Sequence, residues 1–314
     1  MFNIIELNLI DKKITKIENI NSNLEILFLD HNFIYQLENL PTNLKQLYIS
    51  YNDINELKNL PDYLLVLYIN KNVITDLYGL NNNLRELYIS NNNITEINYL
   101  PDALEILDVS YNKIKFLDKL PDNLHMLLIN NNNIEKIIKM PDSLVHLNLN
   151  HNKLTKIENV SKNLVELNLN YNNIEIIENL PDSLKQLHLK NNKISKIENL
   201  PEQLKIFSIN HNKISKIENL PNDLSWLTIN NNNITKIENL PKLKHLEIHS
   251  NKIFKLENLP DTLECLDVWN NNITRFDNEL LKLKNLKTFF FNDDIVNMTI
   301  LVQYKLIIMN MIYK

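Results

Sequence analysis

The chain has 314 residues, of which 44% are hydrophobic, and a formal net charge of -5 at pH 7. This composition supports a sizeable apolar core and argues against disorder. A single glycine, Gly79, excludes the glycine-rich phosphate loops, dinucleotide fingerprints and nucleophile elbows of many enzymes. Only Arg85 and Arg275 among the 33 basic residues are arginines, so a nucleic-acid partner is not expected.

The chain starts with a segment, residues 1–7, that lacks the basic and continuous apolar regions of a signal peptide. The lone cysteine, Cys265, excludes internal disulfides. We therefore expect an intracellular, cytoplasmic protein, in the host cytoplasm if the source is a virus or a secreted effector. Polar residues interrupt the apolar segment 295–313, so we expect a cap there and no membrane span.

A period of 20 residues runs through the sequence and is clearest between Pro181 and Leu200. The register holds over residues 1–240, shortens by one in the copy starting at Pro241 and lengthens in the copy starting at Pro260. A fixed period in this range predicts a solenoid, in which each repeat packs only on its neighbours. All ten prolines stand at the first position of a repeat and predict corners outside the strands.

The segment Leu-x-x-Leu-x-Ile-x-x-Asn-x-Ile, as in residues 84–94, is similar to the hallmark of the leucine-rich repeat family, over nearly the whole chain. The resemblance implies an α/β solenoid that is mostly β, a horseshoe with one short parallel strand per 20-residue repeat. About nine residues remain after each strand, too few for a crossover helix. We expect a convex side of turns, extended chain and 3-10 pieces, and gentle curvature.

The predicted organisation is one solenoid over residues 1–314, with a cap-like repeat at 1–20, regular repeats at 21–282, and a degenerate repeat and C-terminal cap at 283–314. The repeat length and Leu-Pro junctions resemble bacterial effector repeats. Lys-Ile-Glu-Asn-Leu, at 196–200 and 216–220, instead resembles phosphatase-regulator repeats. Similar Asn- and Ile-rich arrays occur in large DNA viruses and AT-rich protists.

Each repeat alternates inward and outward residues, as Leu87 and Ile89 do with Glu86 and Tyr88, which predicts a half-buried strand. The resemblance also implies that one asparagine per repeat turns inward and bonds the backbone after the strand, as architecture rather than as a ligand site. This asparagine ladder comprises Asn32, Asn52, Asn72, Asn92, Asn112, Asn132, Asn152, Asn172, Asn192, Asn212, Asn232, Asn251 and Asn271. Lys12 stands at the ladder position of the first copy, as in an end repeat.

Four successive repeats carry an aromatic residue at one outward strand position, and we call these residues the aromatic row: Phe28, Tyr48, Tyr68 and Tyr88. The apolar residues that flank the row are Ile26, Val66, Ile106 and Met126. Two interpretations are open: the rings merely stack across strands, or they form a docking surface for a partner protein. We hypothesise that the row is the main docking surface.

A polar patch is predicted near the C-terminal end and comprises Trp226, His245, Glu247, His249, Asp267 and Trp269, together with Cys265. Its residue types include zinc ligands, but residues two apart on a strand lie roughly 6.5 Å apart, so no metal or cofactor is expected. Cys265-Leu266-Asp267 also has the Cys-x-Asp form found in effector ubiquitin ligases. That family carries the cysteine in a separate helical domain, so we expect no catalytic role.

The sequence therefore favours a non-enzymatic scaffold that binds a protein partner of unknown identity on the concave β-sheet face. One alternative is a subunit similar to protein phosphatase regulators. Another is an effector-type ubiquitin ligase acting through Cys265. A third is a structural protein that self-associates through the solenoid ends.

Overall fold

The computed structural model describes residues 5–274, 280 and 282–292 of the chain. Its contacts divide the chain into two compact units, which we call unit 1 (Met1–Lys153 and Asn159–Leu164) and unit 2 (Leu154–Glu158 and Val165–Lys314). A single continuous solenoid stays a prediction. Most of the expected C-terminal cap, residues 293–314, lies outside the described residues.

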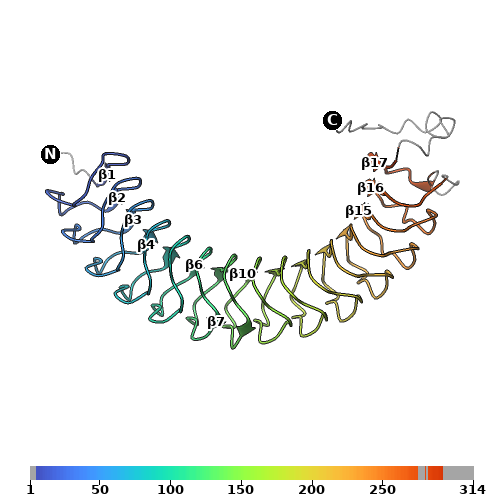
Figure 1. The fold of residues 1–314 in the computed structure, drawn as a ribbon, viewed down its shortest axis with the longest axis horizontal. Helices are drawn as coiled ribbons and strands as arrows, with labels where there is room; N and C mark the ends of the chain where they lie inside the picture. The colour runs from blue at the N-terminus through green and yellow to red at the C-terminus, as the bar shows by residue number, and fades with distance from the viewer. Residues whose placement is uncertain (1–4, 275–279, 281, 293–314) are drawn as a thin grey trace. The chain divides into compact units, whose positions relative to one another are not determined.

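In the part of unit 1 that the structure describes, eight parallel strands pair in chain order in one sheet. They are β1 (Glu6–Asn8), β2 (Ile26–Phe28), β3 (Gln46–Tyr48), β4 (Val66–Tyr68), β5 (Glu86–Tyr88), β6 (Ile106–Asp108), β8 (Met126–Leu128) and β10 (His146–Asn148). Neighbouring strands align residues one repeat apart, as Leu47 does with Leu67. The strands lie along one side of the coils (Figure 1), and we call the opposite side, formed by the connecting segments, the return side.

Among the described residues of unit 2, seven more parallel strands also pair in chain order. They are β11 (Glu166–Asn168), β12 (Gln186–His188), β13 (Ile206–Ser208), β14 (Trp226–Thr228), β15 (His245–Glu247), β16 (Cys265–Asp267) and β17 (Thr288–Phe290). Leu227 aligns with Leu246 and Leu266 with Phe289, so the shortened and lengthened repeats keep the strand register. The extra or missing residues are absorbed in the connections.

The core forms from the inward residues of each repeat, as the alternation predicts. Leu87 and Ile89 are completely buried, as are Leu84 and Ile94 just outside the strand. The equivalent residues line the interior of both units. The solenoid is mostly β, and no α-helix occurs among the described residues. The predicted fold class is confirmed.

Two short strands on the return side of unit 1 were not predicted. β7 (Phe116–Leu117) and β9 (Lys136–Ile137) pair as a separate parallel sheet, opposite the main strands (Figure 1). Backbone bonds flank the pair, from Glu135 N–H to the Lys115 carbonyl and from Ile138 N–H to the Leu117 carbonyl, each 3.1 Å long. The return segments of these two repeats are therefore extended enough to pair directly.

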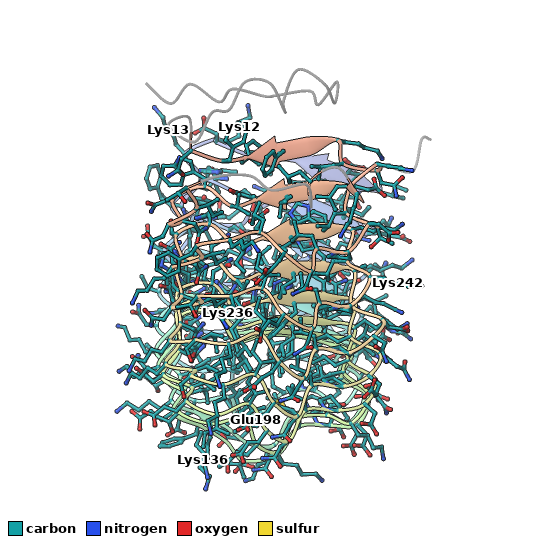
Figure 2. The ribbon with its side chains drawn as sticks, turned by 90° about the vertical axis from the view of Figure 1, so that its right-hand side faces the viewer. Lys12, Lys13, Lys136, Glu198, Lys236 and Lys242 are labelled. Atoms are coloured by element: carbon teal, nitrogen blue, oxygen red, sulfur yellow. The ribbon has the colours of Figure 1, made fainter. Side chains whose placement is uncertain are left out.

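The asparagine ladder follows the strands and bonds each coil to the coil before it. Asn52 Oδ1 accepts the N–H of Ile34 at 2.9 Å, and its Nδ2 donates to the carbonyls of Leu29 and Ile49 at 3.0 and 3.2 Å. Asn232 repeats these bonds in unit 2. In the first coil, Lys12 (labelled in Figure 2) replaces the asparagine. Its backbone N–H donates to Asn32 Oδ1 at 3.0 Å.

A second set of asparagines stabilises the return side. Asn39 has a left-handed backbone, with φ of 57°, and its Nδ2 donates to the carbonyl of Ile17 at 3.1 Å. The same bond to the preceding coil is made by Asn159, Asn179, Asn199 and Asn219. Asparagine tolerates this conformation better than most residues. The asparagine of Lys-Ile-Glu-Asn-Leu is therefore part of the framework.

Candidate functional site

The aromatic row forms a continuous stack on the outward face of β2 to β5. Centroid distances are 4.5 Å from Phe28 to Tyr48, 4.8 Å from Tyr48 to Tyr68 and 4.1 Å from Tyr68 to Tyr88. Adjacent ring planes differ by at most 17°. Because each inner ring is covered on both faces by its neighbours, the row presents ring edges and hydroxyls to solvent. The stacking interpretation and the docking interpretation are thus compatible.

The hydroxyls of the row are anchored by side chains two residues earlier on the same strand. Tyr48 Oη donates to Gln46 Oε1 at 3.1 Å, and Tyr88 Oη donates to Glu86 Oε2 at 3.2 Å. Burial raises the pKa of both hydroxyls, and the neighbouring Tyr68 and Glu86 raise it further. Both groups therefore stay protonated near neutral pH and keep a fixed orientation.

The flanking residues Ile26, Val66, Ile106 and Met126 are all half-buried on the strand face. They do not form an unbroken apolar strip, because Gln46 lies between Ile26 and Val66 in the register. Glu86 likewise separates Val66 from Ile106. The surface beside the aromatic row therefore alternates apolar and polar side chains.

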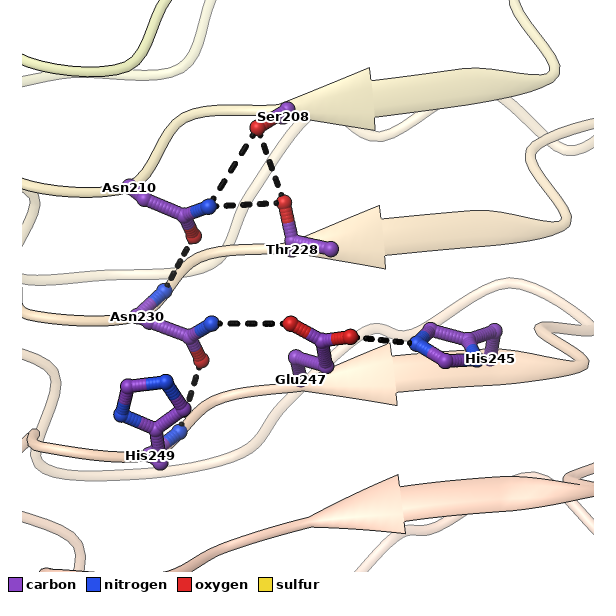
Figure 3. Close-up of polar contacts among 7 residues, drawn as sticks. All are labelled: Ser208, Asn210, Thr228, Asn230, His245, Glu247 and His249. Carbon is purple, nitrogen blue, oxygen red and sulfur yellow. Dashed lines mark hydrogen bonds and ion pairs between the residues drawn. The ribbon is translucent and has the colours of Figure 1, made fainter.

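The predicted polar patch is brought together in unit 2 and is tied to a hydrogen-bond network (Figure 3). His245 Nε2 lies 2.8 Å from Glu247 Oε1, and Glu247 Oε2 accepts Asn230 Nδ2 at 3.0 Å. Asn230 Oδ1 accepts the backbone N–H of His249 at 2.9 Å. The network thus links β15 to the residues that follow β14.

The network extends to residues that the sequence analysis did not single out. Asn230 N–H donates to Asn210 Oδ1 at 2.7 Å, and Asn210 Nδ2 donates to Thr228 Oγ1 at 3.0 Å (Figure 3). The Thr228 hydroxyl donates to Ser208 at 2.9 Å. The sequence does show small polar residues at outward positions of neighbouring repeats. Which of these side chains form hydrogen bonds with one another depends on their rotamers, which the sequence does not give.

Charge in the patch is set by the His245–Glu247 pair. Burial lowers the pKa of His245, but hydrogen bonds to Cys265 and Glu247 outweigh it and raise the pKa to about 9. The hydrogen bond from His245 lowers the pKa of Glu247. Burial raises the pKa of Asp267 on the next strand. Near neutral pH, His245 is therefore an imidazolium and Glu247 a carboxylate.

Two exposed indoles border this pair. Trp226 is 42% exposed and stacks flat on His245, with centroids 3.6 Å apart. Trp269 is 53% exposed and meets His249 edge to face at 6.3 Å. Exposed tryptophans beside a fixed charged pair are typical of interface anchors.

The profile described as Leucine Rich Repeat matches residues 83–101 of the chain, which hold the repeat with β5. No curated protein sequence matches. Among solved structures, YopM of Yersinia pestis, described as a leucine-rich effector protein, superposes with a TM-score of 0.78 at 26% identity. The alignment covers 92% of this chain and 85% of YopM. The chain therefore has the fold of leucine-rich repeat proteins.

Two further structures are similar to this solenoid. A leucine-rich repeat protein of Leptospira interrogans has a TM-score of 0.74 at 23% identity, covering 96% of this chain and 94% of that chain. A chain in the LRIM1/APL1C complex has a TM-score of 0.69 at 21% identity, covering 90% of this chain and 62% of that chain. These two show the shared fold. The resemblance to effector repeats is carried by YopM.

Possible metal-ligand side chains do not cluster in the described part of the solenoid. No group of three or more His, Cys, Asp or Glu side chains there is arranged to hold a metal ion. Cys265 is a half-buried free thiol in a repeat strand, aligned with His245. Within the same residues, no helix has the length and apolar character needed to cross a bilayer.

Proposed function

We propose that this solenoid is a non-enzymatic scaffold that binds a protein partner on the outward face of its strands, with the aromatic row as the main docking surface. The stack of four half-buried aromatic side chains carries the proposal. Its rings are already ordered, so a partner would immobilise few side chains on contact. The LRIM1/APL1C structure, a complex in which a chain with this fold occurs, supports protein binding as the general role.

The residues of the repeat framework bear on the cellular compartment and on the two alternative functions, phosphatase regulation and ubiquitin transfer. We propose a reducing compartment, because the single Cys265 is a free thiol. Regulation of a phosphatase rests on Lys-Ile-Glu-Asn-Leu, yet Asn199 and Asn219 in that segment bond the preceding coil. That segment therefore supports a shared shape rather than a shared partner. Ubiquitin transfer would need Cys265 to act from within a sheet, which is not favoured.

The test replaces the three tyrosines of the row in one variant, Y48S/Y68S/Y88S. A matched control, Y35S/Y111S, removes two exposed tyrosines that lie outside the strands. Each protein is used for affinity purification from its host, and co-purifying proteins are quantified by mass spectrometry. We expect the triple variant to lose at least one partner by tenfold or more, while the control keeps it. If circular dichroism shows that the triple variant is folded and it still co-purifies with every partner, the proposal is wrong.

The polar patch is a second candidate surface, favoured by the two exposed indoles. In this reading Trp226 and Trp269 are the anchors, and the His245–Glu247 pair supplies a fixed charged centre. A W269A variant leaves the Trp226–His245 stack intact and removes one anchor. Loss of a partner that Y48S/Y68S/Y88S retains would assign that partner to the patch. Retention of every partner by W269A would exclude Trp269 as an anchor.

A further inference from the structure

The return side of unit 1 departs from the repeat pattern around β4 and β5. In most repeats the two positions before the final leucine of the repeat are polar, as Glu198 and Asn199 are. Here they are Tyr78 and Gly79 in one repeat, and Tyr99 takes the second position in the next. Tyr78 and Tyr99 are 62% and 70% exposed. Large aromatic side chains have replaced solvated ones on a surface that needs none for folding.

Gly79 creates space beneath these rings. Its φ is +103°, and a Cβ atom there would lie 2.5 Å from the carbonyl oxygen of Leu57 in the preceding coil. The main chain therefore approaches that coil closely, and two adjoining depressions form on either side of Gly79. One is lined by Asp62 and Tyr63, and the other by Lys58, Tyr78 and Tyr99. Gly79, Leu80 and Asn82 line both.

The tyrosine rings in these depressions do not stack face to face with their neighbours, unlike the rings of the aromatic row. Tyr78 and Tyr99 meet at 85° with centroids 5.7 Å apart, so the pair leaves ring faces open. Tyr63 is 64% exposed, and among the described residues it has no ring partner. Within that part of the chain, the hydroxyls of the three tyrosines donate to no internal acceptor. We call the surface formed by Tyr63, Tyr78, Gly79, Asn82 and Tyr99 the tyrosine groove.

Charge beside the tyrosine groove is negative. Glu56, Asp76 and Glu96 occupy one repeat position in three successive coils, and Asp62 lines the groove itself. The same repeat position holds lysine in unit 2, at Lys196, Lys216 and Lys236. Like charges in neighbouring coils repel each other, so this row opposes folding slightly.

Lys58, the cation that lines the groove, forms an ion pair with only one of these carboxylates. Lys58 is paired with Glu56 at 2.6 Å. Among the described residues, no ion pair joins Asp62, Asp76 or Glu96 to a lysine or arginine. The groove therefore combines open aromatic faces, free hydrogen-bond donors and uncompensated carboxylates.

We propose that the tyrosine groove binds an extended, proline-containing segment of a partner protein that also carries arginine or lysine. Proline rings pack on aromatic faces, and the carbonyls of a polyproline segment are free acceptors for the tyrosine hydroxyls and the Asn82 amide. A guanidinium or ammonium group is attracted by the carboxylate row and by the tyrosine faces. This site lies off the strand face and does not depend on the aromatic row.

The test measures fluorescence anisotropy of a labelled peptide made of three Arg-Pro-Pro repeats, titrated with the full chain. Two comparison peptides replace either every proline by alanine or every arginine by glutamate. We expect both comparison peptides to bind at least tenfold more weakly, and added salt to weaken the first peptide. Equal binding of the alanine peptide would overturn the proline preference, and equal binding of the glutamate peptide would overturn the charge preference.

Variants of the chain locate the site. Y78A/Y99A should weaken binding of the Arg-Pro-Pro peptide at least tenfold, because two of the three aromatic rings of the groove are removed. Y48S/Y68S/Y88S should bind it as the unmodified chain does, since the aromatic row lies on the strand face. Both variants must keep the circular dichroism of the parent. Unchanged binding by Y78A/Y99A, or no binding by the parent chain, would refute the proposal for the tyrosine groove. Neither result would affect the proposal that the aromatic row binds a partner.

Discussion

The indole of Trp226 lies flat on the imidazole of His245, with centroids 3.6 Å apart and planes inclined by 10°. The same imidazole contacts Glu247 through Nε2 at 2.8 Å. An indole face and a carboxylate both favour the imidazolium form over the neutral ring. His245 therefore joins an aromatic contact between β14 and β15 to a charge interaction within β15.

This arrangement predicts that His245 contributes stability in its protonated form. Its pKa of about 9 lies above the ordinary value of 6.5, so the contribution is complete below pH 6.5 and is lost as the pH rises through 9. The substitution H245Q should remove that dependence. We expect the urea midpoint of the parent to fall more steeply than that of H245Q between pH 6.5 and 9. Equal slopes would show that His245 is neutral in the folded chain.

His188 provides a control with the opposite sign. Burial lowers its pKa below 6.5, although Glu166 opposes the shift in part. Stability is therefore lost as the pH falls below 6.5, where the unfolded chain takes up the proton more readily. H188Q should reduce this acid-side loss and leave the alkaline side unchanged.

The asparagine ladder predicts that replacing Asn132 lowers stability strongly, whereas replacing its neighbour Asn133 hardly changes stability. In N132A, the N–H of Ile114 and the carbonyls of Val109 and Ile129 lose a buried partner. We expect the free energy of unfolding to fall by on the order of 3 kcal/mol. N133A removes a side chain with no hydrogen bond among the described residues, and the change should stay within about 0.5 kcal/mol. Urea unfolding followed by circular dichroism measures both.

Gly79 should tolerate no side chain. In G79A the new Cβ meets the Leu57 carbonyl, and a φ of +103° is unfavourable for alanine, so we expect a loss of about 2 kcal/mol. Asn59 takes the equivalent position one repeat earlier with a φ of 64°. N59G adopts that backbone without strain and should change stability by no more than about 0.5 kcal/mol. Similar thermal unfolding of G79A and the parent would mean that the coils separate easily at this point.

The aromatic row should also support the sheet, independently of any partner. Y68A removes two stacking contacts, with Tyr48 and Tyr88, each of roughly 0.2 to 1 kcal/mol. The expected loss of stability is therefore about 0.4 to 2 kcal/mol. Y63A, which removes an exposed tyrosine without a ring partner in the described structure, should have little effect. If the two variants unfold alike in urea, the stack does not stabilise the sheet.

The repeat period was sufficient to predict the strands outside the β7–β9 pair and their register. Because Leu87 and its equivalents recur at intervals of 20 residues through most of the chain, one buried position fixes the alignment of these strands. The left-handed turns were harder to predict, because glycine is the usual marker for positive φ and this chain has one. Tyr51 and His31 adopt φ of 56° and 55° directly after their strands. Their side chains stack at 4.1 Å, which offsets part of the backbone strain.

The candidate sites were predicted unevenly, for a physical reason. Outward residues such as Tyr48 and Trp226 could be identified from their position in the repeat. Whether rings stack flat or meet edge to face depends on side-chain rotamers, which a repeat pattern does not contain. The tyrosine groove was missed because it depends on the close approach of Gly79 to Leu57, between residues 22 positions apart.

Ladder asparagines in the 20-residue repeats bond residues 18 and 23 positions away in the preceding coil, as Asn72 does with Ile54 and Ile49. In the shortened repeat, Asn251 makes the same bonds to residues 17 and 22 positions away. Every coil within a unit therefore offers its neighbour the same bonding partners, whichever copy that neighbour is. Recombination between copies that adds or removes a whole 20-residue segment would rejoin matching surfaces and preserve the fold. A gene of this kind can change the length of its product in steps of one repeat, while the residues that break the pattern are gained or lost with the copy that carries them.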